Sequence, residues 1–344
     1  MKKVKDNINW DKPEEYEELG INFIHVGKPS GTYSFTGKDE QLQYSKTLSM
    51  LEIPKDWRYR NEDISYTFNS EGFRNDFEFA DVDWSKAVGI LGCSHIFGKG
   101  INQQFTIPNH IGNKLNLRSV NLGSEGAGIR TVFNNAIHLM DRYYPKAIAV
   151  LWPSINRVSL AYKWDTVENG WSSIDMSGTE KEVSLFRPKE PDQYGLIANE
   201  QIQLKYRDLW PRIDESHFLE NQDMVYQLNL YRQTLKVIAR DRNISYYDFS
   251  LTRTNIPGKN ALDRVKAPYP DIMRPNFNYI GDYENSKPGW IHMPDEHKIW
   301  WLNNVCARDI TVFDRSHGNG PGGSHFGPVL NKAIAKLILE NKLV

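Results

Sequence analysis

The sequence predicts an α/β fold, a three-layer α/β/α sandwich around a central parallel sheet. Three short apolar runs, each ending in small or polar residues, are typical of buried parallel strands. The runs are Ala87–Cys93, Ser119–Gly123 and Ala147–Pro153. Helix-like segments separate them, and this alternation indicates right-handed βαβ units.

The predicted helices follow the strands in order. Phe105–Leu115 follows the first run and Ile129–Tyr143 the second. Asn221–Arg240 is expected to be a helix because its apolar residues form one stripe at helical spacing, and Ile244–Ser250 is expected to be another strand. The stripe consists of Met224, Leu228, Tyr231, Leu235 and Ile238. Pro328–Lys342 is expected to be the closing helix, with Pro328 in its first turn.

The remaining segments are less regular. Residues 1–80 have weak periodicity and are interpreted as an N-terminal extension to a domain of residues 81–344. Within that domain, residues from about 158–220 and 251–305 are rich in Pro, Gly, Asn, Asp and aromatic residues. We interpret both as insertions over the carboxyl ends of the strands, where open α/β sheets bind ligands.

The composition excludes several classes of protein. The 344 residues include 42 basic and 43 acidic side chains, a net charge of −1 that gives no reason to expect a nucleic-acid partner. The two cysteines, Cys93 and Cys306, are too few for a disulfide framework and lack metal-ligand spacing. The basic N-terminus leads into acidic residues, which is unlike a signal peptide, and no run approaches the ~18 apolar residues of a membrane span. The sequence indicates no oligomeric state.

Ser94 follows the first predicted strand directly, in the stretch Gly92–Gly100 (GCSHIFGKG). Glycines on both sides allow a sharp turn that leaves a hydroxyl open to a ligand. A helix beginning at this turn would favour developing negative charge. The alternative is an ordinary strand–loop–helix turn in which the serine caps the helix.

This stretch resembles the first block of the SGNH (GDSL-type) hydrolases, which usually reads Gly-Asp-Ser before a short apolar segment and Gly. Cys93 stands where the family has Asp, a residue that is not the acid of its catalytic triad. Residues 69–74 (NSEGFR) resemble the N-S-x-G-F-R stretch that often precedes the block. The GCSH variant is associated with bacterial and phage members. The resemblance implies a flavodoxin-like SGNH fold with Ser94 as the nucleophile.

Two further blocks supply the expected oxyanion hole. Gly123 matches the glycine after the second strand, and Asn156 the asparagine after the third, although Ser154 stands where the family usually has Gly. The resemblance implies that the amides of Ser94 and Gly123 and the side chain of Asn156 bind the oxyanion. The alternatives are a glycine-rich βα loop without the Lys-Ser/Thr of a P-loop, and a turn asparagine.

The last block, Asp-x-x-His before the final helix, has two candidate histidines. His325 has the family's distance to the closing helix, but Gly322 occupies the usual place of the acid. His317 keeps the Asp-x-x-His spacing through Asp314. We expect His325 to be the base and Asp314 its orienting acid, with Asp309 and His317 as the alternatives.

The resemblance therefore implies a serine esterase that hydrolyses an acyl or acetyl ester by a Ser-His-Asp mechanism, with no metal or organic cofactor. The substrate is expected to be a small-molecule or carbohydrate ester, the carbohydrate being suggested by the aromatic-rich insertions. Two alternatives remain open: a non-catalytic binding or structural module, such as a phage-particle component, and an O-acyltransferase. The expected location is cytoplasmic or virion-associated.

Overall fold

A computed structural model gives the structure of the central and C-terminal parts of the chain. It describes residues 30–34, 55–60, 62–153, 157–162, 170–175, 222–250, 295–308, 311–312, 321–322 and 325–343. Parts of both predicted insertions, including residues 176–221 and 251–294, lie outside the described residues.

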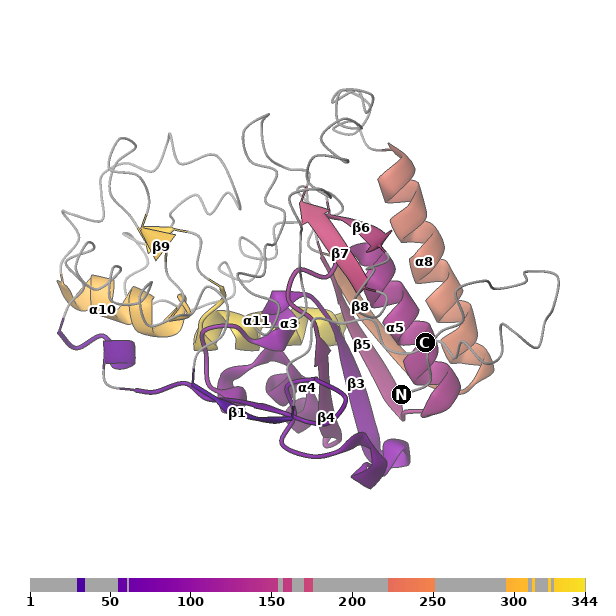
Figure 1. The fold of residues 1–344 in the computed structure, drawn as a ribbon, viewed down its shortest axis with the longest axis horizontal. Coiled ribbons are helices and arrows are strands. Elements are labelled where there is room, and N and C mark those ends of the chain that lie inside the picture. Colours follow the sequence, from indigo (N-terminus) through magenta and orange to yellow (C-terminus); the bar gives the residue numbers. More distant parts are fainter. Residues whose placement is uncertain are drawn as a thin grey trace.

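A four-stranded parallel sheet forms the centre of the fold (Figure 1). Its strand order is β4-β3-β5-β8. The strands are β3 (Ala87–Gly92), β4 (Arg118–Gly123), β5 (Ala147–Trp152) and β8 (Ser245–Ser250). β3 pairs in parallel with both β4 and β5, so the three apolar runs lie side by side as predicted. The prediction of an α/β fold with a parallel sheet is confirmed.

Helices pack against this sheet in two pairs (Figure 1). They are α4 (Ile107–Leu115), α5 (Ile129–Arg142), α8 (Gln222–Asp241) and α11 (Pro328–Glu340). α5 contacts α8, and α4 contacts α11. In the described part of the chain, no helix is long and apolar enough to cross a membrane.

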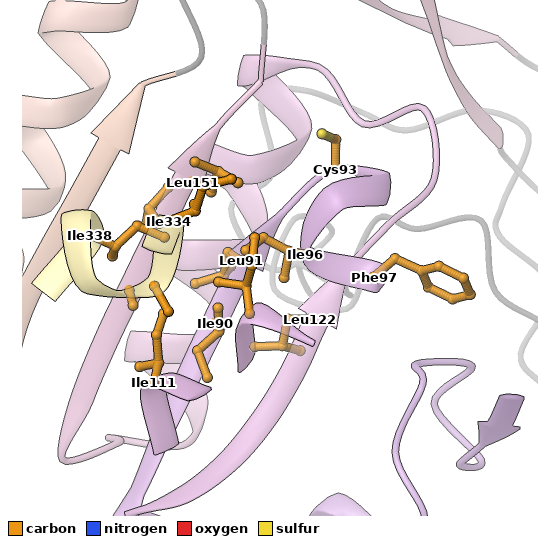
Figure 2. Close-up of a cluster of buried hydrophobic side chains, with 14 of the residues drawn as sticks. Ile90, Leu91, Cys93, Ile96, Phe97, Ile111, Leu122, Leu151, Ile334 and Ile338 are labelled. Atoms are coloured by element: carbon orange, nitrogen blue, oxygen red, sulfur yellow. The ribbon is translucent and has the colours of Figure 1, made fainter. Parts of the chain in front are cut away.

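Apolar side chains of α4 and α11 pack against the sheet and form part of the buried core. Figure 2 shows Ile111 of α4 close to Ile90 of β3, and Ile334 of α11 beside Leu151 of β5. All four side chains are fully buried. α4 begins two residues later than predicted, because residues 103–105 form a separate 3-10 turn and Thr106 caps the helix by accepting a hydrogen bond from the Asn109 amide.

Both outer strands of the sheet have hydrogen-bond partners on their outer edges. At β4, the Asn75 side chain donates to the Asn121 carbonyl and accepts from its amide, both at 2.9 Å. At β8, the chain after α11 adds an antiparallel bridge between Lys342 and Tyr247. Because unpaired strand edges invite aggregation, these contacts protect the sheet.

Several smaller elements surround the sheet. Antiparallel pairs form between β1 (Gly31–Tyr33) and β2 (Tyr66–Phe68), between β6 (Arg157–Tyr162) and β7 (Gly170–Asp175), and between β9 (Thr311–Val312) and β10 (Pro321–Gly322). The helices are α3 (Ser94–Phe97) and α10 (Asp295–Asn304), with 3-10 turns at Arg58–Arg60, Phe79–Asp81, Trp84–Lys86 and Gln103–Phe105. The β6–β7 hairpin and α10 are regular elements inside the segments interpreted as insertions.

The segment before residue 81 contributes aromatic side chains to the same core. Its buried aromatic residues are Trp57, Tyr59, Tyr66, Phe68, Phe73 and Phe79. The Tyr66 ring stacks on Phe97 of α3, with ring centroids 5.7 Å apart. This part of the chain therefore packs against α3, the short helix that begins at Ser94.

A buried carboxylate ties α8 to the sheet. Asp248 of β8 is fully buried and accepts two hydrogen bonds from the Arg232 guanidinium of α8, at 2.6 and 2.8 Å. The Trp152 indole and the Tyr246 hydroxyl also donate to it, each at 3.1 Å. Burial, together with the Asp248 charge, raises the pKa of Tyr246 far above its usual value. These hydrogen bonds satisfy the buried carboxylate of Asp248 and join the edge strand β8 to the helix α8.

Candidate active site

The structure brings Ser94 and His325 into direct contact, although 231 residues separate them in the sequence. Their side chains form a hydrogen bond of 2.7 Å between Ser94 Oγ and His325 Nε2. Ser94 is the first residue of α3, immediately beyond the carboxyl end of β3, and only 7% of its surface is exposed. A hydroxyl and an imidazole at this distance are placed for proton transfer.

The turn around Ser94 is tight because glycines bound it. Gly92 has no room for a side chain, since an added Cβ would lie 2.8 Å from the Leu151 carbonyl oxygen. Gly98 ends α3 in the left-handed conformation (φ +80°), and its amide donates to the Ser94 carbonyl at 3.0 Å. The short helix therefore presents Ser94 at a defined position, as the glycine pattern predicts.

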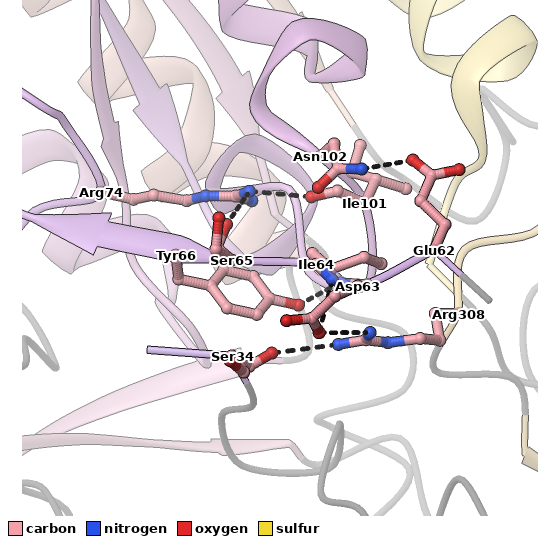
Figure 3. Close-up of polar contacts among 11 residues, drawn as sticks. Ser34, Glu62, Asp63, Ile64, Ser65, Tyr66, Arg74, Ile101, Asn102 and Arg308 are labelled. Atoms are coloured by element: carbon pink, nitrogen blue, oxygen red, sulfur yellow. Dashed lines mark hydrogen bonds and ion pairs between the residues drawn. The ribbon is translucent and has the colours of Figure 1, made fainter. Parts of the chain in front are cut away.

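Arg74 supports this turn from within the core. Its guanidinium donates to the carbonyls of Phe97 at 3.1 Å, Gly98 at 2.5 Å and Ile101 at 2.8 Å, and more weakly to that of Ser65 at 3.4 Å. Figure 3 shows the side chain reaching the Ile101 and Ser65 carbonyls. The residue is 1% exposed, so these bonds form away from bulk water. In the sequence, Arg74 stands out only as the last residue of the NSEGFR stretch, and its supporting role was not predicted.

Gly123 lies at the closest approach between β4 and α3. A Cβ added there would stand 2.1 Å from the Phe97 amide nitrogen and 2.6 Å from the Ile96 carbonyl carbon. The Gly123 amide donates to Asn121 Oδ1 at 2.9 Å, and Asn121 Nδ2 donates to the Phe97 carbonyl at 3.3 Å. The Gly123 amide, which is expected to bind an oxyanion, is thus already hydrogen-bonded to Asn121 in this conformation.

The loop after Gly123 continues towards α5. The Ser124 amide donates to the Gly92 carbonyl at 3.0 Å, which holds the start of the loop against the end of β3. Gly126 adopts a left-handed conformation (φ +71°). Its amide makes no hydrogen bond with another residue in the described ranges. The loop therefore offers the Gly126 amide as a hydrogen-bond donor in addition to the Gly123 amide.

The chain after α10 holds His325 in place. The Ala307 amide donates to the His325 carbonyl at 3.0 Å, and the Gly327 amide donates to the Val305 carbonyl at 2.7 Å. The Arg308 amide donates to the Gly100 carbonyl at 2.8 Å and links this segment to the Ser94 turn. The short segment between α10 and His325, which follows the predicted insertion, therefore positions His325, a role that the sequence did not reveal.

Aromatic packing orients the same segment. The ring of His95, next to Ser94, stacks on Phe326 with centroids 4.1 Å apart and lies 5.0 Å from the His325 ring. Asn331 of α11 donates to the Phe326 carbonyl at 2.9 Å. α11 begins at Pro328, three residues after His325, as the predicted register requires.

The other predicted site residues fall outside the part of the chain that the structure describes. They are Asn156, Asp309, Asp314 and His317. Among the described residues, no group of three or more His, Cys, Asp or Glu side chains could hold a metal ion. Cys93 and Cys306 are both buried, and neither forms a disulfide with the other.

The close approach at Gly123 leads to a prediction. Gly123→Ala is expected to destabilise the protein by about 2 kcal/mol, because the new methyl group meets backbone atoms of α3 that a rotamer change cannot move. The free energy of urea-induced unfolding measures this effect. Unchanged stability would show that the ends of β4 and α3 are not in contact.

The site thus holds a serine hydroxyl and an imidazole 2.7 Å apart, at the carboxyl end of a buried parallel strand. An imidazole that takes the hydroxyl proton makes the serine a nucleophile towards an electrophilic carbonyl. The sequence matches no protein-family model, and a search of the curated proteins finds no match.

Proposed function

We propose that the chain is a serine esterase that hydrolyses acyl or acetyl esters, with Ser94 as nucleophile and His325 as general base. The observation that carries this proposal is the 2.7 Å hydrogen bond between Ser94 Oγ and His325 Nε2. The small exposed fraction of Ser94 also supports it, because partial exclusion of water strengthens electrostatic interactions in a site.

The mechanism follows from this pair. Ser94 Oγ attacks the ester carbonyl carbon while His325 Nε2 takes the hydroxyl proton. His325 then returns that proton to the leaving alcohol, which leaves an acyl group on Ser94. In the second half-reaction His325 takes a proton from water as the water attacks the acyl-serine carbonyl. His325 then returns this proton to Ser94 Oγ as the ester bond between Oγ and the acyl carbon breaks, which releases the acid and restores Ser94 and His325. No cofactor takes part in these steps.

An oxyanion forms in both tetrahedral intermediates and needs hydrogen-bond donors. We assign this role to the Ser94 amide, the Asn156 side chain and the loop that begins at Gly123. For the Gly123 amide itself to donate, it has to release Asn121 Oδ1, which it holds at 2.9 Å. The loss of one such donor typically costs ~3 kcal/mol of transition-state stabilisation.

Asp314 is proposed as the acid that orients His325 through Nδ1, with Asp309 as its alternative. An acid in this position fixes the tautomer in which Nε2 accepts the Ser94 proton. The proposed substrates are small-molecule or carbohydrate esters.

The proposal includes the SGNH fold, a three-layer α/β/α sandwich. Its support is the separation of the helices into two contacting pairs, α4 with α11 and α5 with α8, around the parallel sheet. The order of the matching sequence blocks, each at a strand end or helix start, also supports it.

The proposal is tested with p-nitrophenyl acetate and a fluorophosphonate probe. We expect hydrolysis of the ester, and labelling at Ser94 when the probe-bearing peptide is mapped by mass spectrometry. Ser94→Ala is the matched control and should lose both, with an almost unchanged melting temperature. Full activity in that variant, or labelling of another serine, would contradict the assignment.

An acceptor sugar in the same assay separates the alternatives. Formation of an acetylated sugar at the expense of acetate would identify an O-acyltransferase that uses the same serine. Absence of both turnover and labelling in the unaltered protein would indicate a non-catalytic module.

A further inference from the structure

We infer that Lys99 and Glu125 are positioning residues that hold the proposed oxyanion loop against the Ser94 turn. The inference rests on the proposed function and adds to it a pair of charged residues that the sequence analysis did not single out. Lys99 Nζ lies 2.5 Å from Glu125 Oε1.

The pair joins the two loops that the proposed mechanism needs. Lys99 lies two residues after the end of α3, and its amide donates to the carbonyl of Ser94 itself at 3.3 Å. Glu125 lies between Ser124, whose amide is bound to the end of β3, and Gly126, whose backbone is left-handed. The ion pair therefore connects the nucleophile turn to the middle of the Gly123–Gly128 loop.

Burial makes the loss of this contact more disruptive than the loss of an ordinary surface ion pair. The Lys99 side chain is 6% exposed and that of Glu125 is 26% exposed. Removing one partner leaves the other charge poorly solvated, so the loop has to rearrange to satisfy it. Exposed ion pairs are instead screened by water and salt and contribute little.

A displaced loop affects catalysis in a specific way. The donors of an oxyanion hole act mainly on the transition state, so misplacing them lowers kcat more than it raises KM. The hydrogen bond between Ser94 and His325 does not involve this loop, so the shape of the pH profile of kcat/KM should persist. These two features distinguish loop positioning from a general loss of structure.

The test is a double-mutant cycle with Lys99→Met, Glu125→Gln and the double variant, assayed with p-nitrophenyl acetate. We expect each single change to lower kcat by about tenfold or more, with KM nearly unchanged, because small misplacements of donors are costly. The double variant should be no worse than the poorer single variant, because the two residues act as one unit. The pH profile of kcat/KM should keep its midpoint.

The matched control is Glu340→Gln, which removes an exposed ion pair with Lys336 on α11, where the side chains are 43% and 71% exposed. This variant should keep full activity. If Lys99→Met does not fold, Glu125→Gln alone carries the test, since it preserves size and occupies a partly exposed site. Thermal unfolding of each variant shows which ones are folded.

The outcomes separate this inference from the proposed function. If the unaltered protein hydrolyses the ester but Glu125→Gln keeps its full kcat, or if the two single effects multiply in the double variant, the positioning role is refuted. If the unaltered protein neither turns over the ester nor is labelled at Ser94, the proposed function fails and the positioning role fails with it.

Discussion

His325→Ala is expected to lower kcat/KM for ester hydrolysis by at least about 10³-fold, because it removes the group that takes the Ser94 proton. The reason is geometric, since His325 Nε2 lies 2.7 Å from Ser94 Oγ. The measurement is steady-state hydrolysis of p-nitrophenyl acetate across a range of pH. The melting temperature should be determined in parallel, because the His325 ring lies beside that of His95.

The matched control is His317→Ala, a histidine eight positions earlier that keeps the Asp-x-x-His spacing. Its activity should stay close to that of the unaltered protein. A large loss in His317→Ala together with a small loss in His325→Ala would transfer the role of base to His317. Equal, small losses in both variants would speak against a histidine-dependent mechanism.

Arg74→Met is expected to lower the free energy of unfolding by about 3–5 kcal/mol, the largest effect on stability that we predict. The guanidinium is 1% exposed and satisfies the carbonyls of Phe97, Gly98 and Ile101. Methionine fills much of the same space but donates no hydrogen bonds, so the Gly98 and Ile101 carbonyls lose this donor within the core, and the Phe97 carbonyl keeps only that of Asn121. Urea-induced unfolding followed by tryptophan fluorescence measures the change.

Arg240→Met is the control, because the Arg240 side chain is 67% exposed and pairs only with its neighbour Asp241 among the contacts described. That change should cost less than about 0.5 kcal/mol. Arg74→Lys should fall between the two, since an ammonium cannot match the geometry of a guanidinium fork. A loss below about 1 kcal/mol in Arg74→Met would show that the guanidinium does not support the turn.

The parallel sheet was predictable because its strands are short, apolar runs with both faces buried. β3 is buried at every residue, and a fully buried parallel strand has to be apolar throughout. α8 was predictable for a related reason, since its apolar residues recur at helical spacing. The boundaries differ by one or two residues where a cap or a 3-10 turn intervenes, as at Thr106.

The contacts that support the site were not predictable in the same way. Nothing in the spacing of Lys99 and Glu125 indicates that their side chains meet. Arginine side chains are normally exposed, so the residue type of Arg74 argues against the burial that the structure shows. The segment after α10 carries no pattern that relates it to His325, because its contacts with that residue are made by backbone amides and carbonyls.

Local patterns were therefore sufficient to predict the parallel sheet and the positions of Ser94, at a strand end, and of His325, before the closing helix. These features follow from local patterns: apolar periodicity, flanking glycines and a proline at a helix start. The folded structure was needed to show that the two side chains lie 2.7 Å apart, that Arg74 supports the Ser94 turn and that the Gly123 amide donates to Asn121. The contacts of His325 and Arg74 join residues far apart in the chain, and all three contacts depend on how the elements pack, which local patterns do not encode.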